Sequence, residues 1–421
     1  MIDRHLSRRS VLKSAAAAVV ASPYVIPSAV LGNAEKPPAS ERVAIGHIGL
    51  GNRGRQVLRE FQRCKGVQSV ACADCYSDRR EAVAAQIRGK AYADFRDLLA
   101  DPGIDAVVIA TPDHWHVPIA IAAARAKKDA YVEKPLGVSV EQDLACQQVF
   151  EENGRVFQYG TQQRSMPHCH LGCELVRAGK IGKLQRIEVL APNGGSGGST
   201  VEIPVPKTLD YQMWNGPAPM KPYTADRCKP PGTYWIYDYS IGYLGGWGAH
   251  PLDIMVWGSD CDLAGPYTVQ GTGVIPQEGL YDTVYNWDVT IQTAAGVEIT
   301  FKPGSDSTKF IGTEGWIDVR RNKALNDSQP KSLLQAKLDP EKTTLPVSVH
   351  HQQNFIDAVK SRGKAVSHLA DAVRSDLISQ LCNIAIRLRR PVTWDPKQRT
   401  IVSDAEAVKM MHRPMREPWS L

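Results

Sequence analysis

The sequence lacks any apolar run long enough to cross a bilayer, which takes about 18 or more consecutive apolar residues. The mildly apolar run near its start covers only Ala15 to Ala21, so stable membrane insertion is not expected. The sequence also lacks internal repeats and, after residue 40, low-complexity segments. These absences favour an ordinary globular protein, and the 421 residues are enough for two domains with their own cores.

Strong charge of one sign is also missing. The formal net charge is +6, and half of it comes from segment 1–40, which holds five basic and two acidic residues. The remaining chain is close to neutral for its size. Nucleic-acid binding is therefore not expected, because it would need a marked basic excess.

Nine cysteines are present, but their spacing does not suggest a disulfide framework. Cys72 and Cys75 form a CxxC that overlaps the end of an expected strand. The run His168–Cys173 (HCHLGC) resembles a metal cluster, yet no second cluster of suitable spacing accompanies it, and the run is expected to begin a helix that extends to Gly179. We expect no metal site.

Segment 1–40 has the three regions of an export signal in the correct order. Ser7–Lys13 (SRRSVLK) is basic, Ala15–Ala21 is mildly apolar, and small residues and prolines follow as far as Gly32. The paired arginines and the trailing lysine are typical of a twin-arginine signal. We therefore expect export to the periplasm or beyond by the twin-arginine machinery, which carries proteins that are already folded and could already hold a cofactor.

A glycine-rich turn is the most informative motif. Gly49, Gly51 and Gly54 form a GxGxxG between the apolar run Val43–Ile48 and a helical run, and Asp74 follows Gly54 by 20 residues. The glycines would allow a tight turn, close approach of a pyrophosphate and close helix packing, while Asp74 would accept the adenine ribose hydroxyls. This pattern predicts NAD as cofactor, although Arg79 and Arg80 leave NADP possible.

Alternating apolar and helical runs from residue 42 to about 160 predict a parallel sheet with helices on both faces. The expected strands are Val43–Ile48, Val67–Ala73, Ala106–Ala110, Asp129–Val132 and Val156–Tyr159. After the irregular stretch Pro204–Pro231, alternation predicts antiparallel strands with one open face, and helices are expected over Gln353–Ser361 and Asp371–Leu388. The fold class is α/β, with a Rossmann domain at 41–163 and an α/β domain with a large, mostly antiparallel open sheet at 164–421.

Four motifs together resemble the Gfo/Idh/MocA oxidoreductases, the relatives of glucose–fructose oxidoreductase and inositol dehydrogenase. They are the glycine turn, Ala110–His116 (ATPDHWH), Tyr131–Leu136 (YVEKPL) and Gly245–Asp253 (GGWGAHPLD). The resemblance implies a Rossmann domain joined to an α/β domain, and oxidation of a secondary alcohol of a sugar or cyclitol by NAD(P). It implies these cofactor contacts: Gly49, Gly51, Asn52, Arg53, Gly54, Asp74, Thr111, Pro112, His114, Trp115, His116, Glu133, Lys134 and Pro135.

The resemblance implies Lys134, His250 and Asp253 as catalytic residues. A desolvated lysine can donate to the reacting oxygen, a cis bond to Pro135 is plausible, and His250 can take the hydroxyl proton. Asp253 lies one helical turn beyond His250, but the two could instead serve only to cap the helix and to bond a backbone group. The expected substrate contacts are Lys134, Gln162, Arg164, Tyr234, Trp235 and His250, with the aromatic rings suited to stacking on a sugar.

One position departs from the family pattern. Inositol dehydrogenases carry an aspartate four residues before the histidine, where this chain has Gly246. Tyr239, Tyr243 or Asp238 could replace it. Three functions therefore stay open: an oxidoreductase or transhydrogenase with tightly bound cofactor, an NAD-dependent glycoside hydrolase that works by transient oxidation and elimination, and a catalytically weakened sugar-binding relative. A homo-dimer or tetramer is expected, because an open sheet face commonly buries itself against a second copy.

Overall fold

Six parallel strands form the first sheet, in the order β3-β2-β1-β4-β5-β6. The computed structural model describes residues 38, 41–259, 263–321, 326–338 and 344–421, so nearly all of the expected export signal lies outside the described residues. The strands are β1 (Val43–Ile48), β2 (Val67–Ala73), β3 (Lys90–Tyr92), β4 (Ala106–Ile109), β5 (Asp129–Val132) and β6 (Phe157–Tyr159). This confirms the predicted Rossmann sheet, to which the structure adds the three-residue strand β3.

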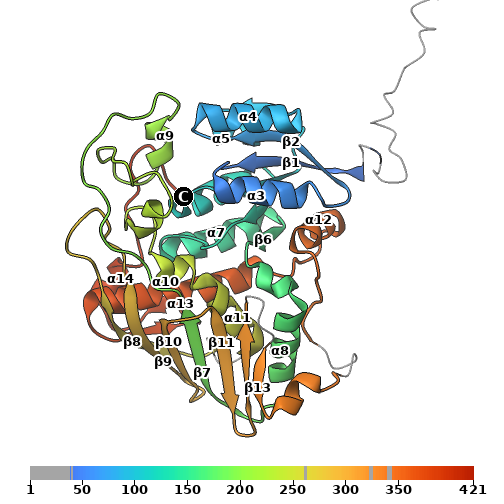
Figure 1. The fold of residues 1–421 in the computed structure, drawn as a ribbon, viewed down its shortest axis with the longest axis vertical. Coiled ribbons are helices and arrows are strands. Elements are labelled where there is room, and N and C mark those ends of the chain that lie inside the picture. The colour runs from blue at the N-terminus through green and yellow to red at the C-terminus, as the bar shows by residue number, and fades with distance from the viewer. Residues whose placement is uncertain (1–37, 39–40, 260–262, 322–325, 339–343) are drawn as a thin grey trace, which may run out of the picture. The chain divides into compact units, whose positions relative to one another are not determined.

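Five helices alternate with these strands: α3 (Asn52–Phe61), α4 (Ser77–Ile87), α5 (Phe95–Ala100), α6 (Asp113–Arg125) and α7 (Val140–Asn153) (Figure 1). Local chemistry sets their ends. The Ser139 hydroxyl accepts a hydrogen bond from the Gln142 N–H at the start of α7, and Gly154, at a φ of 58°, ends it. The strand order reverses between β1 and β4, and ligands bind at the carboxyl edge of such a reversal.

The second sheet has nine strands in the order β13-β12-β11-β7-β10-β9-β8-β14-β15. They are β7 (Leu184–Ala191), β8 (Tyr267–Val274), β9 (Asn286–Thr293), β10 (Glu298–Pro303), β11 (Ser307–Gly312), β12 (Trp316–Arg320), β13 (Asp327–Gln329), β14 (Val392–Asp395) and β15 (Thr400–Ile401). Of the neighbouring pairs, β7–β10 is parallel and the others are antiparallel. The predicted large, mostly antiparallel open sheet is confirmed.

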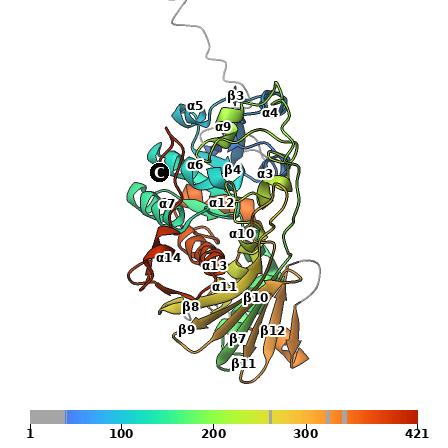
Figure 2. The ribbon, with the colours of Figure 1, turned by 90° about the vertical axis from the view of Figure 1, so that its left-hand side faces the viewer.

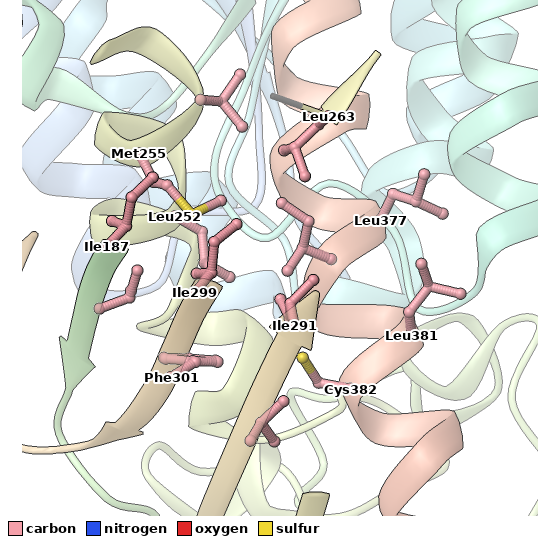
Figure 3. Close-up of a cluster of buried hydrophobic side chains, with 14 of the residues drawn as sticks. Ile187, Leu252, Met255, Leu263, Ile291, Ile299, Phe301, Leu377, Leu381 and Cys382 are labelled. Carbon is pink, nitrogen blue, oxygen red and sulfur yellow. The ribbon is translucent and has the colours of Figure 1, made fainter. Parts of the chain in front are cut away.

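Helices α11 (Ala249–Ser259) and α13 (Leu369–Leu388) cover one face of this sheet (Figure 2), and α8 (Pro167–Arg177) packs against α11 and β12. Burial alternates along β9, as expected for a strand with one covered face. Figure 3 shows Leu252 and Met255 of α11 beside Ile187 and Ile299, and Leu377 and Leu381 of α13 near Ile291. Each such fully buried side chain contributes about 1.5–3 kcal/mol of transfer free energy.

Later parts of the chain complete the core of the first sheet. Phe355 and Ile356 of α12 (His351–Ser361) pack with Ile45 and Phe61, and the ring of Trp419 lies 4.8 Å from that of Trp115. Helix α13 contacts β6 and α7 as well as β8. Residues 43–421 therefore form one compact unit, in which the first sheet precedes the expected boundary at 163/164 and the second sheet follows it.

Short helices complete the path through the long loop and the C-terminal region: α9 (Tyr211–Asn215), a 3-10 turn at Gly232–Trp235, α10 (Tyr243–Gly246) and α14 (Ala405–Lys409). Helix α9 lies inside the stretch that the sequence predicted to be irregular. Within the described residues, the helices are too short or too polar to span a membrane.

Candidate active site

The glycine-rich turn joins β1 to α3 with almost no room for side chains. Gly49 has a φ of +86°, and an added Cβ would lie 2.7 Å from the backbone of Ala110. At Gly54 a Cβ would lie 1.9 Å from the carbonyl oxygen of Gly49, so this glycine lets the helix pack on the turn. Gly51 has open space, with Arg79 Nη1 as the nearest atom at 4.0 Å. The backbone is therefore accessible at Gly51, where a pyrophosphate would approach it.

A cavity of about 440 Å³ lies at the carboxyl edge of the sheet, a size suited to a small-molecule or cofactor site. The buried Thr111 hydroxyl in its wall has no hydrogen-bond partner among the described residues. Eight of the residues that the sequence predicted for the cofactor line the cavity: Gly49, Gly51, Asn52, Arg53, Asp74, Thr111, Pro112 and Trp115. The turn, the cavity and the unpartnered hydroxyl fit a dinucleotide.

Asp74 holds the turn as well as facing the cavity. Its Oδ2 accepts a hydrogen bond from the Leu50 N–H (2.6 Å), and its Oδ1 accepts one from the Tyr76 N–H (2.8 Å). Oδ1 also accepts a weak hydrogen bond from the Cys75 thiol at 3.7 Å, so Oδ2 is the oxygen that keeps a second lone pair for a ribose hydroxyl. The Arg79 guanidinium lies over the Tyr76 ring at 3.6 Å and also lines the cavity.

The three aromatic residues after β4 divide between two roles. Trp115 lines the cavity and donates Nε1–H to the Trp214 carbonyl (3.0 Å). The two histidines turn to the backbone instead: His114 Nε2 lies 3.0 Å from the Trp214 carbonyl oxygen, and His116 bridges the carbonyl oxygens of Pro135 (2.6 Å) and Thr111 (2.9 Å). These bonds use both side chains to hold neighbouring loops and give no support to the expected cofactor contacts of His114 and His116, which stay predictions.

Glu133 and Lys134 follow β5 at the same edge. Glu133 accepts hydrogen bonds from Arg53 Nη2 (2.8 Å) and Gln162 Nε2 (3.1 Å). Burial alone would raise the pKa of Glu133, but the charge and hydrogen bond of Arg53 outweigh it and hold this pKa below its usual value. Gln162, expected to touch substrate, thus positions Glu133 and, at 2.8 Å, the Tyr131 hydroxyl.

Lys134 is oriented toward the second sheet. The Lys134–Pro135 bond is cis, as expected from the sequence, and Nζ donates to the Gly246 carbonyl oxygen at 2.7 Å. Burial lowers the pKa of Lys134, while Glu133 and Asp113 oppose that change. The lysine therefore reaches the position at which the family pattern has an aspartate, and there it meets a backbone oxygen.

Arg164 and Asp253 pair with each other. Arg164 Nε and Nη2 donate to the two oxygens of Asp253 (2.8 and 2.7 Å), and Nη1 donates to Asp371 (2.6 Å). The side chains of Arg164 and Asp253 are 1% and 0% exposed. These contacts do not support the expected substrate contact of Arg164 or the catalytic role of Asp253, because both side chains are engaged in a buried ion pair that ties the turn after β6 to α11 and α13.

His250 lies in the first turn of α11, 2% exposed, and its buried Nδ1 has no hydrogen-bond partner among the described residues. Burial, followed by the charges of Arg321 and Lys134, lowers the pKa of His250 well below its usual value. The ring is therefore neutral at physiological pH and can accept a proton.

A row of aromatic rings leads from the cavity to His250. Tyr234 lines the cavity, its ring lies 6.2 Å from that of Tyr243, Tyr243 lies 5.6 Å from Trp247, and Trp247 lies 6.0 Å from His250. Trp235 is buried against Tyr243, at 4.3 Å, and packs under the loop. Of the two aromatic residues expected at the substrate, Tyr234 is the one that faces the cavity.

The three candidates to replace the family aspartate differ in availability. Tyr239 is fully buried and donates to Asn215 (2.8 Å). Asp238 pairs with Lys221 at 2.6 Å. Tyr243 alone among them belongs to the aromatic row beside Trp247.

Further polar residues of the site were missed from the sequence. Asp113 is buried and accepts a hydrogen bond from the Ser240 hydroxyl at 2.6 Å. Asp306 and Arg321 come from the ends of sheet strands, and no motif marks them. His168 and His170 direct Nε2 toward the carbonyl oxygens of Arg320 and Leu345, and the described residues contain no acidic, histidine or cysteine cluster suited to a metal ion.

A parallel sheet with a glycine-rich turn and a cavity at its carboxyl edge are the features of a dinucleotide-binding protein. Residues 43–161 match the family model described as oxidoreductase family, NAD-binding Rossmann fold. Residues 196–421 match that of the oxidoreductase family, C-terminal alpha/beta domain. The chain belongs to the Gfo/Idh/MocA oxidoreductase family, and its first domain is an NAD-binding Rossmann domain.

Relatives include two kinds of sugar-active protein. The chain is 34% identical over 138 residues to scyllo-inositol 2-dehydrogenase (NAD(+)) of Bacillus subtilis, covering 32% of this chain and 40% of that protein. It is 33% identical over 142 residues to a glycosyl hydrolase family 109 protein of a Shewanella species, covering 31% and 28%. The chain thus spans less than half the length of the curated relatives it matches.

The fold is also found among solved structures. Levoglucosan dehydrogenase, in complex with NADH and L-sorbose, aligns with a TM-score of 0.63 over 84% of this chain and 99% of that one, at 17% identity. At that identity the likeness concerns the fold alone.

Proposed function

We propose that this protein oxidises a secondary alcohol of a sugar, glycoside or cyclitol with NAD as the hydride acceptor. The observation that carries the proposal is the pairing of Lys134 with His250. One is a lysine of lowered pKa and the other a neutral buried histidine with an unpartnered nitrogen, and both lie about the ring of Trp247.

Each residue has a role that its surroundings favour. Lys134 Nζ, 2.7 Å from the Gly246 carbonyl oxygen, donates a hydrogen bond to the alcohol oxygen and stabilises charge that builds there. His250 Nδ1 accepts the hydroxyl proton as the carbon–hydrogen bond breaks, so that alcohol becomes ketone. NAD, when bound, supplies the hydride acceptor. Arg53 and Gln162 fix Glu133, which keeps the adjacent lysine in place.

The experiment is an incubation of the purified chain with NAD and a panel of polyhydroxylated rings: scyllo-inositol, D-glucose, levoglucosan and methyl glycosides. Growth of the reduced-nicotinamide absorbance, with a ketone product identified by mass spectrometry, is the expected result. If no ring is oxidised or cleaved although NAD binds, the assignment to an active enzyme is wrong, and the third hypothesis, a weakened sugar-binding relative, takes its place.

A glycoside hydrolase is the second candidate, favoured by the glycosyl hydrolase relatives and by Gly246 in place of the family aspartate. Such an enzyme would oxidise the ring, eliminate the aglycone and reduce the ring again. The same incubation separates the two functions: cleavage of a methyl glycoside without accumulation of reduced nicotinamide supports the hydrolase.

We infer that the protein is exported through the twin-arginine pathway and holds its cofactor tightly, since free NAD is scarce outside the cytoplasm. Segment 1–40 carries the paired Arg8 and Arg9. A variant with both arginines changed to lysine should stay in the cytoplasm, whereas the wild-type chain should reach the periplasmic fraction with a nucleotide bound. Equal distribution of the two chains would contradict export by this pathway.

A further inference from the structure

Four polar side chains surround the indole of Trp247. Its Nε1–H donates to Asp306 Oδ2 at 3.2 Å. The Arg321 guanidinium lies 5.4 Å from the ring centroid, Lys134 Nζ lies 6.0 Å from it, and the His250 ring is centred 6.0 Å away. Lys134 and His250 are the proposed reacting residues. Asp306 and Arg321 therefore contact the same indole ring as the two proposed reacting residues.

Asp306 is placed there by the second sheet. It lies between β10, which ends at Pro303, and β11, which begins at Ser307. Its side chain is 4% exposed, and Oδ2 accepts from both Trp247 and Arg321 Nη1, the latter at 3.4 Å. The backbone N–H of Arg321 also donates to the Asp306 carbonyl oxygen at 3.3 Å, which fixes the two residues together.

The other carboxylate oxygen of Asp306 is different. Oδ1 is buried and has no hydrogen-bond partner among the described residues, as is also true of His250 Nδ1. A buried acceptor without a partner costs free energy, and a ligand hydroxyl that donates to it removes that cost. Burial raises the pKa of Asp306, but the Arg321 charge and, more weakly, that of Lys134 oppose this change, which agrees with the closeness of the three groups.

We propose that Asp306 determines substrate specificity: its Oδ1 accepts a hydrogen bond from a hydroxyl near the reacting carbon, and Arg321 donates to that hydroxyl or its neighbour. Asp306, placed by the second sheet, then provides a carboxylate near the reacting residues, whereas Gly246 has no side chain at the position of the family aspartate. The acceptor Oδ1 suits a neutral polyhydroxylated ring, because a ring hydroxyl can donate to it whereas a carboxylate has no proton to donate. A sugar acid would bring a second negative charge beside Asp306. This inference rests on the proposed function, whose substrate class it narrows.

The test measures how much each ring hydroxyl contributes to binding. Binding of scyllo-inositol, D-glucose, levoglucosan, their monodeoxy derivatives and D-glucuronate is measured by calorimetry on the NAD-loaded full chain. The proteins are wild type, Asp306→Ala, Asp306→Asn and, as a control, Glu406→Ala. Glu406 is an acid of α14 whose side chain is 65% exposed. Bound NAD and near-ultraviolet circular dichroism report whether each variant folds, and Asp306→Asn decides the test if the alanine variant does not.

In wild type and the control, loss of one particular hydroxyl should weaken binding about 10- to 100-fold, the range for hydrogen bonds to charged groups. In Asp306→Ala that penalty should vanish, and in Asp306→Asn, which keeps an uncharged acceptor, it should shrink. A full penalty in Asp306→Ala, or tighter wild-type binding of D-glucuronate than of D-glucose, overturns the inference while the proposed function stands. If wild type neither binds nor oxidises any ring, the proposed function fails, and the inference fails with it.

Discussion

The guanidinium of Arg164 lies between two carboxylates, 2.7 Å from Asp253 and 2.6 Å from Asp371. Removal of Asp253 would leave a buried cation with half of its partners, which typically costs about 3–5 kcal/mol. We therefore expect Asp253→Ala to lower the melting temperature strongly, as measured by calorimetry, whereas Glu406→Ala, at a side chain that is 65% exposed, should leave it nearly unchanged. A wild-type melting temperature combined with a large loss of kcat would instead restore a catalytic role for Asp253.

Burial and nearby cations also predict the pH profile of catalysis. The pKa of His250 lies well below 6.5, so the neutral ring that accepts the proton persists below pH 6.5. The pKa of Lys134 lies below 10.5, so its donating form is lost before pH 10.5 is reached. Consequently kcat/KM for oxidation should not fall as pH drops through 6.5, and its alkaline limb should lie below 10.5. An acidic inflection at 6.5 would mean that His250 is solvated or that another base acts.

The turn between β1 and α3 offers a matched pair of substitutions. Gly54→Ala would place a Cβ 1.9 Å from the Gly49 carbonyl oxygen, and such overpacking costs about 1–3 kcal/mol or more. Gly51→Ala meets open space at a φ of −65° that alanine readily adopts. We expect Gly54→Ala to lose stability and NAD binding together, and Gly51→Ala to lose NAD affinity at an unchanged apo melting temperature. Equal apo stabilities would contradict the assigned packing role of Gly54.

The elements that the sequence predicted are those with strong local patterns. The strands β1, β2, β4 and β5 are apolar runs that alternate with helices, and the glycine turn has a recognisable GxGxxG motif. Strand β3, with three residues, β13, with three, and β15, with two, are too short for any periodicity to show. Their pairing depends on neighbours that are distant in sequence.

In the site, too, only residues that belong to short local motifs could be predicted from the sequence. Lys134 and His250 belong to short motifs, whereas Asp306 and Arg321 reach Trp247 only because the second sheet brings them there. Arg164 and Asp253 look like polar residues of an active site in the sequence. Their mutual bonds, across 89 positions of the chain, are visible only after folding.

Across the whole molecule, several histidines are buried in the neutral form. Burial lowers the pKa of His47 to about 3, of His114 to about 3 and of His351 to about 4. The unfolded chain takes up these protons near pH 6.5 and the folded chain does not, so stability is full above 6.5 and is lost as pH falls toward 4. Three such groups give a slope of up to about 4 kcal/mol per pH unit.

Thermal unfolding between pH 7 and 5 measures this slope, and His47→Gln should make it shallower. Buried carboxyls of raised pKa, such as that of Asp143, act in the opposite direction, so the comparison of the two proteins decides: an equal slope in wild type and His47→Gln would contradict the burial of His47 in the neutral form.

The open face of the nine-stranded sheet is a candidate surface for self-association. Its outward side chains on β9, such as Asp288 and Gln292, are exposed in the single chain. We propose that this face is buried in a homo-dimer or tetramer. Light scattering coupled to gel filtration should give a mass of two or four chains, and a monomer at micromolar concentration would contradict the proposal.

We propose that Lys134 acts on the substrate alcohol and is not needed for cofactor binding. The most direct test is single-turnover absorbance at the reduced-nicotinamide band, recorded for NAD-loaded wild type and Lys134→Ala mixed with the ring that wild type oxidises. We expect a rise for wild type and none for Lys134→Ala, although both release the same amount of NAD on denaturation. Reduction by Lys134→Ala at a near wild-type rate would contradict the proposal.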